Sequence, residues 1–310
     1  MMPLRSFVFF ITFFSISCGY THKLAEVKTL TAYPSSSGIE FYNNHFYIIG
    51  DDAKNILILD STFTVKDSIP LYSFDGYRLP WQSKSDLESA GTVFKQKQQQ
   101  ILFLGSGSLP SRNTGWLLDP LSLKKDSIRL DTFFNLLQIK GIEELNIEGL
   151  SSIPGKVILS NRGNKTRPYN FLIITNEGFW ENQSRSPVSL IRLGTQADSS
   201  IFQGVSGLAY APGGDKLMLT VSTEDTKSAV EDGQIGKSFL WIINNFTSKL
   251  RWEGINPNRI IDLEAMDPRF KGHKIESICV TGENKQFISL VLVADNDDGN
   301  STLFRMTIKK

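Results

Sequence analysis

The sequence repeats one pattern five times, and this repetition constrains the fold more than any other feature. Each unit opens with a strand-like segment that carries a small or acidic residue pair, and two strongly apolar segments follow it. The opening segments are SSGIEFY (36–42), DLESAGTVF (86–94), NIEGLSSI (146–153), GVSGLAYA (204–211) and KIESICV (274–280). Such a unit cannot bury both of its faces alone, so neighbouring units must pack against one another.

The five units align on one position, which predicts the architecture. The aligned residues are Ser37, Glu88, Glu148, Ser206 and Glu276, spaced by 51, 60, 58 and 70 residues. Later segments of the units, such as NFLIIT (170–175), are rich in Ile, Leu and Phe, as buried strands are. Units of three or four antiparallel strands predict an all-β fold, a β-propeller with five blades. A sixth, degenerate blade within 248–270 is the alternative, and 131–145 has the pattern of a short helix.

The end of the last unit predicts how the ring closes. This unit finishes with an apolar strand at 302–310 and has no outer strand of its own. The segment LAEVKTLTA (24–32) belongs to no unit and has the length of a strand. We therefore expect 24–32 to join the last blade, which protects that edge of the sheet. Residues 24–310 would then form a single, monomeric propeller domain.

The N-terminus has the pattern of a bacterial lipoprotein signal. One cation precedes an apolar run over 7–16, which is too short to span a bilayer as a mature helix. Ser17 stands directly before Cys18, an arrangement that resembles the lipobox, in which the thiol is acylated. We expect 1–17 to be a signal peptide, Cys18 the lipidated residue and 18–23 a tether. The predicted location is the periplasm, outer membrane or cell surface, with membrane contact through the lipid only; plain secretion or an uncleaved anchor is the alternative.

Charge and composition exclude several classes of partner and site. The chain has 33 Lys and Arg against 32 Asp and Glu, and this near-neutrality rules out a broad electrostatic grip on nucleic acid. Two Cys exclude a disulfide framework. The three His residues have no metal-binding spacing and so do not support a zinc site. The remaining partners are a small ligand or an envelope protein.

A set of short polar motifs lies at the ends of the apolar segments. They are GSGS (105–108) with Arg112, NIEG (146–149), NRGN (161–164), ED (224–225), EDGQIGKS (231–238), KIES (274–277) and VADNDDG (293–299). Over about residues 35–308 this set resembles an uncharacterised bacterial domain family of unknown function. That family is similar in pattern to the phytase-like propellers labelled esterase-like. The resemblance implies a propeller fold, and the family has no established activity.

The repeat alignment predicts a polar site at one mouth of the central channel. Innermost strands line the channel of a propeller, so Glu88, Glu148 and Glu276 should converge on one axis. Like charges this close raise each other's pKa unless a cation neutralises them. The turns after the second strands add further polar groups at the same face: Asp51, Asp52, Arg112, Asn161, Arg162, Glu224, Asp225, Asp295, Asn296, Asp297 and Asp298.

These residue types suggest two functions of different classes. The first is binding of Ca²⁺, which prefers carboxylate and carbonyl oxygens, together with a small anionic ligand. The expected metal ligands are Glu88, Glu148, Glu276, Asp295 and Asp297. The expected ligand-binding residues are Arg112, Arg162, Asn161 and Glu224. Metal-dependent, phytase-like phosphoester hydrolysis would be an extension of this site. The second function is a non-enzymatic scaffold that binds an envelope protein, with the channel charges pairing across blades.

Overall fold

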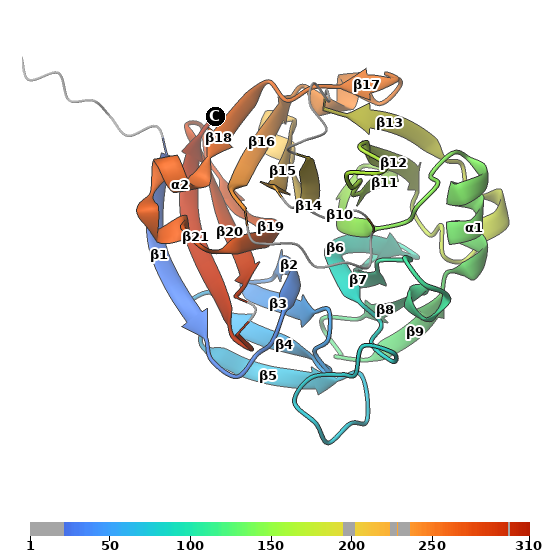
Figure 1. Ribbon diagram of the computed structural model, residues 1–310, viewed down its shortest axis with the longest axis horizontal. Helices are drawn as coiled ribbons and strands as arrows, with labels where there is room; N and C mark the ends of the chain where they lie inside the picture. The colour runs from blue at the N-terminus through green and yellow to red at the C-terminus, as the bar shows by residue number, and fades with distance from the viewer. Residues whose placement is uncertain (1–21, 195–201, 224–227, 229–235, 297) are drawn as a thin grey trace, which may run out of the picture.

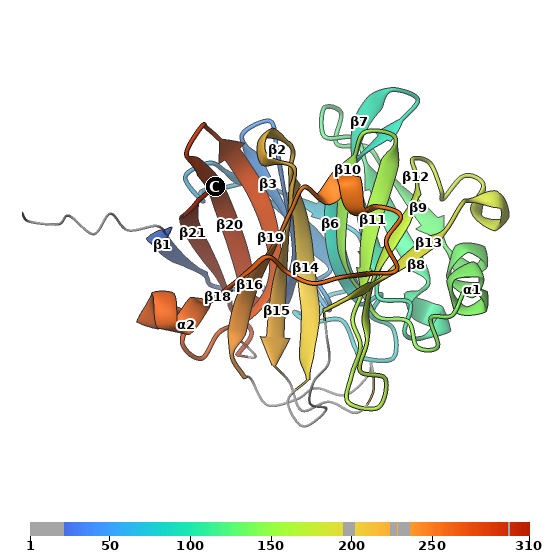
Figure 2. The ribbon, with the colours of Figure 1, turned by 90° about the horizontal axis from the view of Figure 1, so that it is seen from above.

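Five β-sheets stand around a common centre in the computed structural model (Figure 1). The structure describes residues 22–194, 202–223, 228, 236–296 and 298–310. In each sheet an antiparallel meander leads from an innermost strand outward. Turned by 90°, the ring shows its strands running between the two faces (Figure 2). The fold is the five-bladed β-propeller predicted from the repeats.

The strands divide among the blades in chain order, apart from the first strand and β17. Blade 1 contains β2 (Ser36–Tyr42), β3 (His45–Gly50), β4 (Asn55–Asp60) and β5 (Val65–Pro70). Blade 2 contains β6 (Leu87–Lys95), β7 (Gln98–Gly105), β8 (Thr114–Leu118) and β9 (Lys125–Arg129). Blade 3 contains β10 (Ile147–Ile153), β11 (Lys156–Asn161), β12 (Asn170–Asn176), β13 (Ser189–Leu193) and β17 (Gly254–Ile255). Blade 4 contains β14 (Gln203–Ala211), β15 (Lys216–Thr223), β16 (Ser238–Asn244) and β18 (Arg259–Asp262). Blade 5 contains β19 (Lys274–Glu283), β20 (Phe287–Asp295), β21 (Ser301–Lys309) and β1 (His22–Leu30).

Closure of the ring follows the prediction, because β1 is the outer strand of blade 5. It pairs antiparallel with β21, and Leu30 lies opposite Ser301. The segment 248–270 forms no sixth blade. It supplies β18, the outer strand of blade 4, and β17, which pairs in parallel with β13 of blade 3. Both short strands extend sheets that the repeats already form, so the segment adds no blade.

The core of the described chain consists of five apolar clusters, each between two neighbouring blades. Strand β7 shows the arrangement. Leu102 and Leu104 pack toward blade 3, whereas Ile101 and Phe103 pack toward blade 1. Alternate side chains of a strand point to opposite faces, and here both faces are covered. This accounts for the continuous apolar runs that the sequence shows in the middle of each repeat.

Two α-helices lie outside the ring (Figure 1). Helix α1 (Asp131–Ile139) begins the predicted helical segment and ends six residues before it does. Its side chains Phe133 and Phe134 are buried in the cluster between blades 2 and 3, and the Phe133 ring lies 4.4 Å from that of Phe179. Helix α2 (Leu263–Met266) follows β18. Among the residues described, neither helix is long and apolar enough to cross a membrane.

Candidate functional site

Every innermost strand has a β-bulge at the position that the repeats align. The register shifts occur at Ser37, Glu88, Glu148, Ser206 and Glu276. A bulge places one extra residue opposite the partner strand and re-aims its side chain. The repeat position read from the sequence is therefore a single structural position near one end of the channel. We call this end the acidic mouth and define it by Asp51, Asp86, Glu88, Glu148 and Glu276.

The residue after each bulge is small because neighbouring innermost strands approach closely there. These residues are Gly38, Ser89, Gly149, Gly207 and Ser277. A Cβ atom on Gly207 would lie 2.8 Å from the Cα of Ser277, and one on Gly149 would lie 2.8 Å from the backbone nitrogen of Leu208. No larger side chain fits at such contacts. The small residue in each repeat pair therefore lets the blades meet around one axis.

At two of the five bulges a serine hydroxyl links adjacent blades. Ser206 Oγ donates a hydrogen bond to the carbonyl of Ile275 at 2.6 Å. Ser37 Oγ donates in the same way to the carbonyl of Leu87. Each acceptor is the residue just before the next bulge. The serine positions are thus occupied in holding the ring together, and the other three bulges carry carboxylates.

Glu88 lies at the centre of a carboxylate cluster. One oxygen atom each of Asp51, Asp86 and Glu88 lie within 4.8 Å of one another. Burial raises the pKa of Glu88 well above its ordinary range, and the carboxylates of Asp86, Glu148, Asp51 and Glu276 raise it further. The structure therefore brings the three aligned glutamates near one another, as the repeat alignment predicted.

Most carboxylates around Glu88 have cationic or amide partners. Glu148 Oε1 accepts a hydrogen bond from Asn146 Nδ2 at 2.7 Å and lies 3.8 Å from Arg162 Nη1. Glu276 pairs with Lys274 at 2.8 Å. Within the described part of the chain, by contrast, the Glu88 carboxylate makes no hydrogen bond and no ion pair.

Asp51 and Asp86 share a lysine. Lys84 Nζ lies 2.9 Å from Asp86 Oδ1 and also pairs with Asp51. Burial raises the pKa of Asp51 to about 6, with a further contribution from the Asp52 carboxylate. The Lys84 ammonium opposes this shift but does not cancel it. Asp52 in turn pairs with Arg78. The cluster around Glu88 thus holds more carboxylate charge than Lys84 alone can compensate.

The two arginines expected to hold a ligand are buried and paired internally. Arg112, only 2% exposed, pairs through Nη1 with Asp86 Oδ2 and donates to Ser108 Oγ, both at 2.8 Å. Arg162 reaches from blade 3 to Ser222 Oγ of blade 4 at 3.2 Å. It crosses the backbone at Gly204, where a Cβ atom would lie 2.4 Å from the guanidinium. Both arginines therefore hold the mouth together.

Asn161 and Arg162 also line a cavity of about 290 Å³ beside blade 3. The Asn161 side chain accepts a hydrogen bond from the backbone of Asn146 at 2.8 Å, so it also orders the loop before β10. Arg167 and Arg192 line the same cavity. The Arg192 guanidinium stacks 4.3 Å above the Tyr169 ring and has no ion pair among the described residues.

The remaining predicted residues are placed only in part. Asp295 ends β20, lies opposite Lys274 in the sheet register and is half-buried, and its charge acts on Arg78. Glu224, Asp297 and Cys18 lie outside the described residues, as do the predicted signal peptide and residues 18–21 of the predicted tether, whereas 22–23 already belong to β1.

Sequence reasoning missed the residues that stand two positions before each bulge. Asp86, Asn146 and Lys274 occupy this position in the three glutamate repeats, and all three act in the acidic mouth. Ser35 has the same place in blade 1 and accepts a hydrogen bond from Arg78. Comparing the repeats at the position two residues before the aligned one would have identified these residues.

Known proteins resemble this chain in fold, and one family model matches its sequence. A sequence comparison with curated proteins gives no match. The glutaminyl cyclase of Myxococcus xanthus is similar with a TM-score of 0.51 at 10% identity, over 93% of this chain and 97% of that one. Virginiamycin B lyase from Staphylococcus aureus gives 0.45 at 10% identity, over 93% and 99%. A DUF4623 family protein from Bacteroides eggerthii gives 0.43 at 9% identity, over 94% and 77%.

At such identities the likeness to the cyclase supports the fold alone, and the scores below 0.5 carry no argument. The expected likeness to phytase-like propellers is not confirmed by these comparisons. Residues 32–308, which include all five bulges and the whole acidic mouth, match the model of one family. The chain therefore belongs to DUF6929, a family of unknown function.

Proposed function

We propose that the acidic mouth binds a divalent cation, Ca²⁺, and that the protein also takes a small anionic ligand. The observation that carries this proposal is the state of Glu88. It is a partly buried carboxylate that forms no ion pair among the described residues, and four other carboxylates raise its pKa, while the Lys84 ammonium acts on it only from a distance. Such a group must either keep a proton or acquire a cation. A proton neutralises only one charge, whereas a divalent ion neutralises two.

The spacing of the carboxylates supports an oxygen-ligated ion. Ca²⁺ binds oxygens at about 2.3–2.6 Å, so two of its ligand oxygens stand at most about 5 Å apart. The oxygens of Asp51, Asp86 and Glu88 meet this limit at 4.8 Å. The proposed ligand set thus keeps Glu88 from the sequence prediction. It leaves out Glu148 and Glu276 and adds Asp51 and Asp86, because the oxygens of these two aspartates lie within that distance of Glu88.

The ion pairs of Lys84 are the main support for the alternative function, a scaffold whose channel charges only hold the blades together. Its ammonium already compensates part of the charge on Asp51 and Asp86. In the scaffold account Glu88 stays protonated and the mouth binds nothing. In the cation account the ion displaces Lys84 or shares the two aspartates with it. The two accounts therefore differ in what calcium does to the protein.

The anionic ligand fits the cavity beside blade 3 better than the arginines of the mouth. Arg192 is the guanidinium in this cavity without a described carboxylate partner, whereas Arg167, which also lines it, is half-exposed and pairs with Glu143. A planar guanidinium binds phosphate or carboxylate through paired hydrogen bonds. We propose that the envelope location predicted from Cys18 holds for this binding protein. Phosphoester hydrolysis would further need a water activated by the bound ion, and no contact in the mouth argues for it.

Calcium is expected to raise the thermal unfolding midpoint, and Glu88→Gln is expected to abolish the rise. An ion that binds the native state stabilises it by about 2.7 kcal/mol at one hundred times its dissociation constant. That corresponds to a shift of several degrees. Glu283→Gln is a matched control, because this glutamate pairs with Lys310 away from the mouth. An unchanged midpoint of the parent protein at millimolar calcium would rule out the cation site.

The same variant tests the charge state of Glu88 without any ion. A raised folded pKa means that, above the ordinary range of a glutamate, the folded state keeps a proton that the unfolded state has lost. Stability of the ion-free protein therefore falls as pH rises through this window. In EDTA, Glu88→Gln should unfold at a higher midpoint than the parent at pH 8 and at a similar midpoint at pH 4. Calcium affinity of the parent should decrease as pH is lowered.

A further inference from the structure

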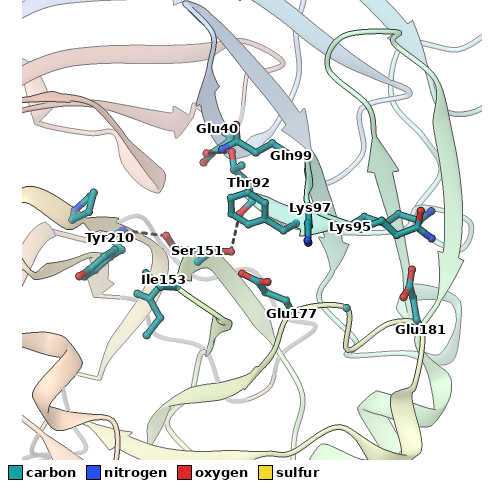
Figure 3. A pocket seen from close by; sticks show the side chains of 16 residues that line it. Glu40, Thr92, Lys95, Lys97, Gln99, Ser151, Ile153, Glu177, Glu181 and Tyr210 are labelled. Atoms are coloured by element: carbon teal, nitrogen blue, oxygen red, sulfur yellow. Dashed lines mark hydrogen bonds between the residues drawn. The ribbon is translucent and has the colours of Figure 1, made fainter.

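A second cavity, of about 800 Å³, opens at the end of the channel opposite the acidic mouth. The innermost strands reach it four residues after their bulges, at Thr92 of β6, Ser152 of β10 and Tyr210 of β14. Four strand residues span about 13 Å. We call this end the far mouth. Figure 3 shows Glu40, Thr92, Ser151, Glu177 and Tyr210 around its interior.

Glu40, Glu177 and Glu181 are the carboxylates that line the far mouth. Glu40 Oε1 accepts a hydrogen bond from Thr92 Oγ1 at 2.6 Å. Among the described residues neither Glu40 nor Glu177 has a cationic partner. A partly buried carboxylate without a counter-charge carries a desolvation cost. The natural complement of this arrangement is a cationic group with hydrogen-bond donors.

Apolar and aromatic groups stand beside these carboxylates. Phe94 is 38% exposed and lines the cavity, together with Ile153 and the Tyr210 ring. Exposed aromatic faces beside carboxylates attract organic cations, which combine an ammonium group with an apolar body. Lys95 and Lys97 also line the cavity, and Lys97 is exposed, so solvent screens its charge. The volume is in the range of sites for small molecules.

We propose that the far mouth binds a small organic amine, with its ammonium group on Glu40 and its apolar body against Phe94 and Tyr210. The site is separate from the proposed calcium site, because different groups at the opposite end of the channel form it. The ligand class follows from the contacts: an ammonium group donates to Glu40, and Glu177 adds negative charge near the opening. A carboxylate ligand would place like charges beside Glu40.

The protonation of Glu40 supports this assignment. Burial raises its pKa to about 7 although the hydrogen bonds from Thr92 oppose the shift. An ammonium ligand binds the ionised form, so amine affinity should rise between pH 6 and pH 8. The neighbouring groups that carry or could carry charge are Lys95, Lys97, Glu177, Glu181, Tyr210, Arg305 and Cys279. Burial raises the pKa of Cys279 well above its ordinary value, so this thiol stays neutral over that range.

The test compares three probes of one shape by isothermal titration at pH 8: phenethylamine, phenethyl alcohol and 3-phenylpropionate. The amine is expected to bind at least tenfold more tightly than the alcohol, because an ionic hydrogen bond is stronger than a neutral one. The carboxylate is expected to bind more weakly than both. Equal affinity of amine and alcohol, tighter binding of the carboxylate or no binding at millimolar concentration would each overturn the proposal.

Variants separate this site from the acidic mouth. Glu40→Gln keeps the shape and an acceptor for Thr92, and it should lower amine affinity about tenfold to one hundredfold. Phe94→Ser should weaken the amine and the alcohol alike. Glu88→Gln should leave amine binding unchanged, while Glu40→Gln should leave any calcium response unchanged. Amine affinity that is insensitive to Glu40→Gln would contradict the assignment, whatever calcium does.

Discussion

Arg112→Met is expected to lower the free energy of unfolding by about 3 kcal/mol or more, because it breaks a buried ion pair from one side. Arg112 and Asp86 are 2% and 5% exposed, and Arg112 Nη1 lies 2.8 Å from Asp86 Oδ2. Lys84 remains close to Asp86 and compensates only part of its charge. The carboxylate would therefore stay buried beside Glu88 with too little positive charge. Urea unfolding of parent and variant measures the loss.

Two controls separate burial from charge in this experiment. Arg129→Met removes an ion pair of similar geometry, with Asp131 at 2.6 Å, but both side chains are more than half exposed. Its cost should be within about 1 kcal/mol. The double variant Arg112→Met/Asp86→Asn removes both charges and should be more stable than Arg112→Met alone. Equal losses for Arg112→Met and Arg129→Met would show that the mouth is not the buried charge network described here.

Gly207→Val is expected to destabilise the ring by about 1–3 kcal/mol or more, because overpacking against a fixed backbone strains both strands. The added Cβ would lie 2.8 Å from Ser277 Cα and 2.9 Å from the Glu276 carbonyl oxygen. These are backbone atoms of the neighbouring blade, so no side-chain rotation relieves the contact. Thermal unfolding and urea titration report the change.

Gly282→Val is the matched control for that substitution. Gly282 also lies in an innermost strand, β19, but a Cβ atom there would meet nothing within 4 Å. Valine is favourable in strands, so this variant should stay within about 0.5 kcal/mol of the parent. If Gly207→Val were as stable as Gly282→Val, the close approach of blades 4 and 5 at the bulge would be wrong.

The bulge residue and the small residue after it could be predicted from the sequence, because two adjacent positions encode this local backbone geometry. A bulge needs a side chain that can be re-aimed, and the next residue must be small where two backbones meet. Two adjacent residues meet both requirements in blade 3, where Gly149 follows Glu148, and in blade 4, where Gly207 follows Ser206. Ring closure through β1 was readable for a similar reason, since one strand-like segment had no repeat of its own.

Other parts of the architecture have no comparable signal. The outer strands β5 and β9 are short, charged and largely exposed, so their sequences resemble loops. The pairing of Lys84 with Asp51 depends on how blades 1 and 2 meet, which no local pattern encodes. Glu40 lies in an aligned segment of blade 1, but its isolation becomes visible only when the neighbouring blade brings Thr92 beside it.

The most direct test of the proposed function is a crystal structure of the protein grown with millimolar CaCl₂ at pH 8. The account predicts an ion bonded to Glu88 at about 2.3–2.6 Å, with oxygens of Asp51 and Asp86 among its other ligands. Glu88→Gln crystals from the same conditions should lack it. If the acidic mouth held no ion at saturating calcium and Lys84 still lay between the two aspartates, the calcium proposal would be contradicted. The scaffold function would then remain.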